Sequence, residues 1–162
     1  MIAQGIAVTT SLQYTFIIAI AAPVGPLLGV LFADRFERKW LVVGAAFCIA
    51  VFGLAFAEMT AALSLIVFGV LVTLSNNVMS FAYHAYQAEL YPTRIRALAV
   101  GFVYSFSRLS VVFSAFVIAF VLGRFGTSGV FALIAGSMGV VMVCVGLLGP
   151  KTSNRALESI AG

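Results

Sequence analysis

Six polar residues recur at spacings of four, three, four, three and four within one long apolar segment: Thr73, Asn77, Ser80, His84, Gln87 and Tyr91. Residues three or four apart share one face of an α-helix, so these side chains form a single stripe. Such a stripe is strongly unfavourable against lipid and has to face protein or water. We predict that it lines a polar pathway, although interhelical hydrogen bonds would use the same residue types. The candidate lining residues are Asn76, Asn77, Ser80, His84 and Gln87.

A second polar position, Arg108, lies in an otherwise apolar run, with Tyr104 one helical turn before it. Arg108 follows Arg96 by twelve residues, or about 18 Å along a helix, which is near the middle of a hydrocarbon core of about 30 Å. His84 precedes Arg94 by ten residues, which places it at a similar depth. We therefore expect Tyr104 and Arg108 to join the pathway and to contact a substrate or a gate. The alternative is an arginine that is held by backbone carbonyls of neighbouring helices.

The remaining reactive side chains do not form a catalytic or metal-binding pattern. The chain has one histidine, and its acids all lie near the ends of apolar segments: Asp34, Glu37, Glu58, Glu89 and Glu158. Cys48 and Cys144 lie inside apolar runs without C-x-x-C spacing, which is typical of packed thiols. An enzyme would need paired acids, a metal cluster or an activated nucleophile. We therefore predict a protein that is not an enzyme and that uses no metal and no cofactor.

The composition indicates that membrane-spanning helices carry these residues. Hydrophobic residues make up 63% of the 162 positions and charged residues 9%, whereas a soluble domain carries about 25% charged residues. Five continuous apolar segments occur, and a helix needs about 20 residues to cross the hydrocarbon core. These segments are residues 12–33, 40–57, 61–91, 97–122 and 129–149. We predict an all-α membrane protein with five transmembrane helices in a single bundle that comprises residues 1–162.

The first segment combines a packing signal with a bending signal. Gly25, Gly29 and Ala33 are spaced four residues apart, and small residues at this spacing let helices approach closely in lipid. Pro23 and Pro26 lie in the same segment and are expected to bend it.

The basic residues predict how the helices are oriented. Seven fall in connections on one side of the membrane: Arg35, Arg38, Lys39, Arg94, Arg96, Lys151 and Arg155. Only Arg124 falls on the other side, so the positive-inside rule places the N-terminus outside and the C-terminus in the cytoplasm. This assigns the chain to an inner or plasma membrane and explains its net charge of +4 without nucleic acid. An uncharged outside N-terminus is natural if further helices precede it, so we expect a fragment.

Three connections carry recognisable motifs. Residues 29–39 (GVLFADRFERK) resemble the G-x-x-x-A-D-R-x-G-R-K/R loop of the major facilitator superfamily, with Glu37 where the family has glycine. Residues 89–96 (ELYPTRIR), followed by Gly101, resemble the E-x-x-P-T-x-x-R stretch of its sugar-porter-like and metabolite–proton symporter branches. Residues 150–158 (PKTSNRALE) are similar to the P-E-T-K-G-R-x-L-E tail of the same branches, with Lys151 in place of the usual acid.

The resemblance implies that the five segments correspond to helices 8–12 of a twelve-helix fold, that is, to the C-terminal half of a transporter whose N-terminal half is absent. It implies secondary active transport of a small polar solute, such as an organic acid, a sugar or a related metabolite, by ion- or proton-coupled alternating access. It also implies a cytoplasmic gating network of Asp34, Arg35, Arg38, Glu89 and Arg94, for which solvated loop charges are the alternative. The implied partners are the solute, the lipid bilayer, and the missing half or a second copy.

A competing interpretation is a non-functional fragment, or a structural or assembly subunit without transport of its own. Half of a transporter lacks half of the cavity, so this interpretation predicts that the chain alone transports nothing. An in-frame upstream sequence that encodes the preceding helices would separate the two.

Overall fold

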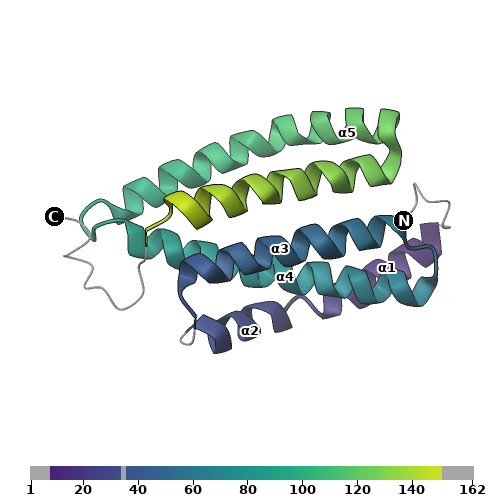
Figure 1. The fold of residues 1–162 in the computed structure, drawn as a ribbon, viewed down its shortest axis with the longest axis horizontal. Helices are drawn as coiled ribbons and strands as arrows, with labels where there is room; N and C mark the ends of the chain where they lie inside the picture. The colour runs from purple at the N-terminus through teal and green to yellow at the C-terminus, as the bar shows by residue number, and fades with distance from the viewer. Residues whose placement is uncertain (1–7, 34–35, 151–162) are drawn as a thin grey trace.

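The computed structural model describes residues 8–33 and 36–150, and every regular element within these ranges is helical (Figure 1). The elements are α1 (Val8–Ile20), α2 (Val24–Ala33), α3 (Arg38–Glu58), α4 (Ala62–Leu90), α5 (Arg96–Val143) and the π-helical turn η2 (Cys144–Leu148). The all-α membrane fold expected from the sequence is therefore confirmed.

The first apolar segment is broken between α1 and α2. Pro23 has no backbone N–H and its ring crowds the preceding turn, so a regular helix cannot continue through it. The backbone here forms hydrogen bonds between residues three apart instead. Ala22 N donates to Ala19 O at 3.0 Å, and Val24 N donates to Ala21 O at 3.1 Å. The bend expected from the prolines is present.

The longest element, α5, doubles back on itself. Gly126 has φ 66° and ψ −163°, a backbone conformation that costs glycine little, and the two limbs on either side of it run side by side in Figure 1. By length and composition, four described segments are suited to cross a membrane: Thr9–Leu31, Arg38–Glu58, Ala62–Leu90 and Arg96–Leu148. The last has 53 residues, about 80 Å if straight, against a core of about 30 Å. The count of five crossings stays a prediction, which the reversal at Gly126 supports.

Helix α3 lies at the centre of the packing and contacts α4, η2 and the second limb of α5. Its buried face is made of small and branched residues, and includes Val42, Ala46, Ile49, Ala50 and Gly53. A Cβ on Gly53 would lie 3.2 Å from the ring of Phe131 in the second limb of α5, so glycine permits this close approach.

Helix α2 packs on α4 through the small residues that the sequence singled out. A Cβ on Gly29 would lie 2.8 Å from the Phe81 ring, and a Cβ on Gly25 would collide with Asn77. Ala33 ends α2, but its side chain lies outside the described part of the structure. The small residues of α2 therefore let the Asn77 and Phe81 side chains of α4 approach its backbone closely, as the four-residue spacing predicted.

The outer surface of the bundle is apolar. None of the residues of α5 is buried, and Phe102, Phe113 and Phe116 are each more than 60% exposed. A soluble monomer rarely exposes contiguous apolar patches of more than a few hundred Å². Such a surface is suited to lipid or to further helices.

Candidate functional site

The polar stripe on α4 divides into residues that pack inside the bundle and residues that remain exposed. Asn77 lies against Gly25 of α2, and its Nδ2 donates to the backbone oxygen of Thr73 at 2.8 Å. Asn76 and Ser80 are exposed. The helix period places all of these residues on or beside one face, but the close approach of α2 covers the Asn77 position.

Towards the end of α4, three side chains form a hydrogen-bonded and aromatic cluster. The Nε2 of Gln87 donates to the hydroxyl of Tyr83 at 2.8 Å, and Gln87 is 8% exposed. The rings of Tyr83 and His84 meet edge to face with centroids 5.8 Å apart. His84 is exposed, and its Nδ1 lies 2.7 Å from the backbone oxygen of Ser80. The cluster therefore presents a hydroxyl and an imidazole outward over a buried amide.

Arg108 and Tyr104 form a pair on the first limb of α5. The guanidinium donates a hydrogen bond to the Tyr104 hydroxyl, and its central carbon lies 4.8 Å from the centroid of the same ring. Both residues are exposed. Among the described residues, no carboxylate forms an ion pair with Arg108. Its remaining N–H groups can therefore bind an anion, and a planar guanidinium matches a carboxylate with two parallel hydrogen bonds.

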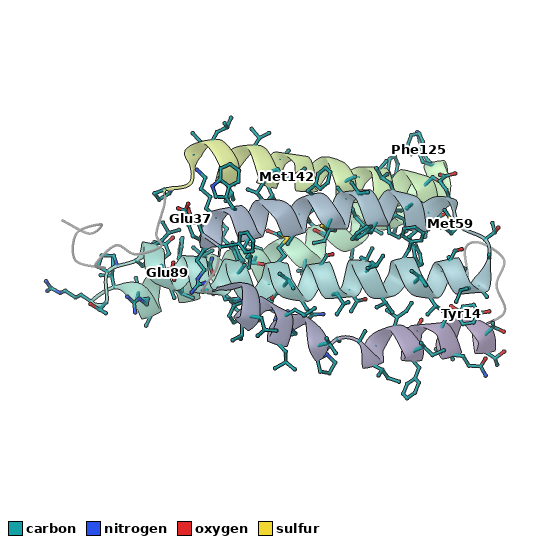
Figure 2. The ribbon with its side chains drawn as sticks, turned by 60° about the horizontal axis from the view of Figure 1, so that its bottom comes forward. Tyr14, Glu37, Met59, Glu89, Phe125 and Met142 are labelled. Atoms are coloured by element: carbon teal, nitrogen blue, oxygen red, sulfur yellow. The ribbon has the colours of Figure 1, made fainter. Side chains whose placement is uncertain are left out.

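The end of the bundle where α3 begins and α4 ends carries the charged contacts, and we call it the charged end. Figure 2 shows Glu37 and Glu89 there, with Met59 and Phe125 at the opposite end. The Nε of Arg38 lies 3.2 Å from Oε1 of Glu89, and the two side chains are 20% and 28% exposed. This ion pair joins the first turn of α3 to the last turn of α4.

Two further hydrogen bonds at the charged end hold the chain that follows η2. The Nζ of Lys39 donates to the backbone oxygen of Gly149 at 2.8 Å, and the hydroxyl of Tyr86 donates to the backbone oxygen of Pro150 at 2.9 Å. Lys39 and Tyr86 are both buried. A Cβ on Gly149 would lie 2.5 Å from the Val145 carbonyl oxygen and 2.7 Å from the Tyr86 hydroxyl, so glycine is required at this position.

Of the other residues predicted for the gating network, only Arg94 lies in the described part of the structure. Arg94 is exposed on the turn between α4 and α5, and Asp34 and Arg35 lie outside the described residues. Glu37 has φ −63° and ψ 134°, an extended conformation that needs no glycine. The departure from the family motif at this position is therefore compatible with the start of α3.

Sequence reasoning did not assign a site role to Tyr83, Tyr86 or Lys39. Tyr83 precedes Gln87 by four residues, and this spacing alone could have indicated their contact. Lys39 and Gly149 are 110 residues apart, and Tyr86 and Pro150 are 64 apart, so their contacts carry no local sequence signal.

Comparison with known proteins places this arrangement in a family. The family model described as the Major Facilitator Superfamily matches residues 3–161. The inner membrane metabolite transport protein YdjE of Escherichia coli is 29% identical over 159 residues, which is 98% of this chain and 35% of that protein. The niacin transporter NiaP of Acinetobacter baylyi is 24% identical over 161 residues, 99% of this chain and 37% of that protein.

A third relative, the minor myo-inositol transporter IolF of Bacillus subtilis, is 28% identical over 132 residues, which is 80% of this chain and 30% of that protein. The chain therefore spans about a third of the length of the curated relatives that it matches. No solved structure matches it. The family model covers nearly the whole chain, its helices are apolar enough to cross a membrane, and the relatives' names are those of transporters rather than enzymes. The chain is an integral membrane protein that belongs to the Major Facilitator Superfamily.

Proposed function

We propose that this chain is the C-terminal part of a secondary transporter that moves a small polar solute, and that the solute is an organic acid or a related metabolite. Transport proceeds by alternating access and is coupled to a proton or another ion. The N-terminus lies outside and the charged end faces the cytoplasm, as the distribution of basic residues indicates.

The observation that carries the proposal is the exposed guanidinium of Arg108 on an apolar helix. An arginine at mid-membrane depth is costly, so such residues face a cavity and find a partner. Its tyrosine neighbour holds one side of the guanidinium and leaves other N–H groups available. An anionic substrate would supply the partner in a site that alternates between the two sides of the membrane.

The exposed polar groups of α4 complete this part of the pathway. Asn76, Ser80 and His84, with Tyr83 beside them, offer donors and acceptors that suit hydroxyl and carboxyl groups. Niacin and myo-inositol, which appear in the names of two relatives, are both small polar molecules.

The charged end supplies the contacts that would latch one conformation. The Arg38–Glu89 ion pair lies between two helices and is partly exposed, so water can compete for it when the end opens. We propose that the same gating network also includes Arg94, Asp34 and Arg35. Because the relatives are about three times as long, helices outside these 162 residues or a second copy would supply the remaining wall of the cavity.

The charge preference of the substrate tests the proposal. Vesicles that contain the full transporter should take up small carboxylic acids and should take up their uncharged amides at least about tenfold less, because the amides lack the carboxylate that pairs with arginine. Equal uptake of the acids and their amides would contradict an arginine-bound anion. If the vesicles take up neither the acids nor their amides, a subunit without transport of its own is favoured.

A further inference from the structure

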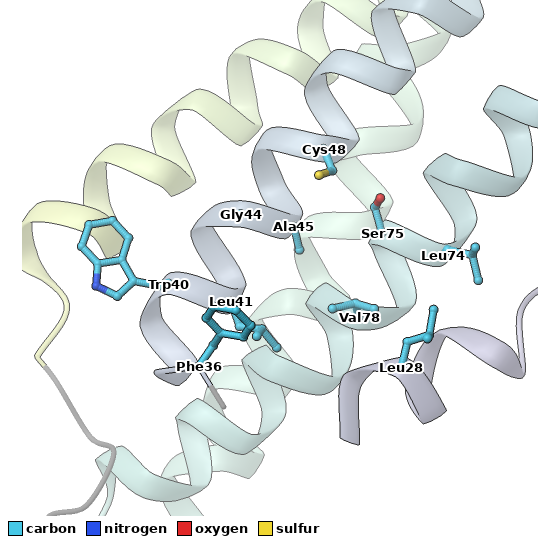
Figure 3. Close-up of a pocket in the computed structure, with 10 residues that line it drawn as sticks. All are labelled: Leu28, Phe36, Trp40, Leu41, Gly44, Ala45, Cys48, Leu74, Ser75 and Val78. Atoms are coloured by element: carbon cyan, nitrogen blue, oxygen red, sulfur yellow. The ribbon is translucent and has the colours of Figure 1, made fainter. Parts of the chain in front are cut away.

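An apolar groove runs along the outside of the bundle between α2, α3 and α4 (Figure 3). Its volume is about 350 Å³, and nearly all of its lining is apolar. Leu28 of α2, Leu41 and Cys48 of α3 and Val78 of α4 form its sides. It is separate from Arg108 and from the exposed polar residues of α4, none of which lines it.

The groove is open at Gly44, which contributes no side chain to its lining. A Cβ on Gly44 would meet nothing within 4 Å, so no neighbouring helix requires a glycine there. Glycine within a helix costs about 1 kcal/mol relative to alanine. Ser75 carries the one hydroxyl of the lining, and this hydroxyl donates to the Leu71 carbonyl at 2.8 Å, so it needs no polar ligand. The groove is therefore suited to a hydrocarbon occupant.

The length of the groove matches one leaflet of a bilayer. Along α3 it extends from Phe36, which precedes the helix, to Cys48. Ten residues of helix separate Arg38 from Cys48, which is about 15 Å, or half of a hydrocarbon core of about 30 Å.

The mouth of the groove has the features of a membrane–water interface. Trp40 lines it there and is 53% exposed, and tryptophan prefers the level of the lipid headgroups. The ammonium of Lys39 lies 5.7 Å from the centroid of the Trp40 ring. The described residues 36–39 and 89–96 at this end of the bundle include four basic residues and two acids, so the mouth attracts anions.

We propose that this groove is a binding site for an anionic phospholipid, with one acyl chain between Leu28, Gly44 and Val78 and the headgroup beside Trp40. The hydrocarbon fills the apolar hollow, and the excess of basic residues selects a negatively charged headgroup over a zwitterionic one. The site is distinct from the proposed solute pathway and does not depend on it.

Trp40 is the only tryptophan of the chain, so it reports on the lipid in the groove. The chain is reconstituted into two sets of equimolar phosphatidylglycerol and phosphatidylcholine vesicles. Bromine is carried by the acyl chains of phosphatidylglycerol in one set and of phosphatidylcholine in the other, so the surface charge is identical. One basic residue near the surface contributes about 1 kcal/mol, so phosphatidylglycerol should occupy the groove at least about fivefold more often, and its bromines should quench Trp40 more strongly.

Two variants that fill the groove from different helices test the location. Gly44→Leu on α3 and Ser75→Leu on α4 should abolish the difference between the two vesicle sets. Gly136→Leu and Ser137→Leu are matched controls that should preserve it, because a Cβ on Gly136 also meets nothing within 4 Å and the Ser137 hydroxyl also bonds to the carbonyl four residues earlier. Equal quenching by both brominated lipids in the unaltered chain overturns the proposal. A difference that survives both groove variants overturns it as well.

Discussion

Lys39, in the first turn of α3, donates a hydrogen bond of 2.8 Å to the backbone oxygen of Gly149, which caps the last helical turn of the described chain. Lys39 is 8% exposed, so its ammonium is withdrawn from water and bonded to a carbonyl that has no helical partner. A cation at the C-terminal end of a helix also complements its dipole. This one contact ties the beginning of α3 to the end of the bundle.

Replacing this lysine should therefore weaken the fold. Lys39→Met keeps the apolar stem and removes the ammonium, and we expect the free energy of unfolding to fall by about 1.5–3 kcal/mol, as for other hydrogen bonds with a charged donor. Denaturation with sodium dodecyl sulfate in mixed micelles measures this change. Arg124→Met is the control, because Arg124 is exposed over the Phe120 ring and should change stability by less than about 0.5 kcal/mol. An unchanged or more stable Lys39→Met variant would show that desolvation of the ammonium cancels the bond.

The Arg38–Glu89 ion pair should show coupling in a double-mutant cycle. Both side chains are partly exposed, so we expect a coupling of only about 0.2–1 kcal/mol between Arg38→Ala and Glu89→Ala in the same unfolding measurement. Arg38→Ala and Glu58→Ala lie at opposite ends of α3 and should be additive. Equal coupling in both cycles would show that the Arg38–Glu89 contact does not contribute to stability.

The α2–α4 contact should not tolerate a larger residue at Gly29. A Cβ there would approach the Phe81 ring to 2.8 Å, so Gly29→Val should destabilise the bundle by about 1–3 kcal/mol through overpacking. Gly136→Val, where the added atoms meet open space, serves as the matched control in this chain. A Gly29→Val variant as stable as its control would mean that α2 and α4 separate easily.

The orientation of the bundle can be measured with cysteines. In a background with Cys48 and Cys144 replaced by alanine, a cysteine at position 38 should resist a membrane-impermeant maleimide in intact cells and react after permeabilisation. A cysteine at position 124 should react from outside, because seven basic residues mark the opposite side as cytoplasmic. Labelling of position 38 from outside would reverse the proposed orientation.

Sequence reasoning accounts for the features of this protein that depend on local chemistry. Long apolar runs predict helices, Pro23 predicts the break between α1 and α2, and the spacing of Gly25 and Gly29 predicts a close helix contact. The chain reverses at Gly126, which lies between the predicted segments 97–122 and 129–149, and helical geometry continues on both sides of it.

What the sequence could not predict are contacts between distant segments. Five of the six stripe residues lie on α4, and Tyr91 follows its last turn in an extended conformation. The stripe has one helical period, but only tertiary packing determines that α2 covers Asn77 while His84 stays exposed. In the same way, Tyr104 and Arg108 are one turn apart and their pairing follows from the helix, whereas the Lys39–Gly149 bond depends on how α3 packs against η2.

Anion binding by Arg108 is tested by measuring uptake per molecule in the full transporter with Arg108→Lys and Arg108→Gln. Membrane abundance is measured alongside uptake of a carboxylate that the unaltered protein transports. We expect normal abundance with uptake reduced at least about tenfold in both variants, because lysine keeps the charge and loses the planar pair of donors. Normal uptake per molecule in both variants would show that Arg108 does not bind the substrate, and lower abundance with normal uptake per molecule would assign Arg108 to packing.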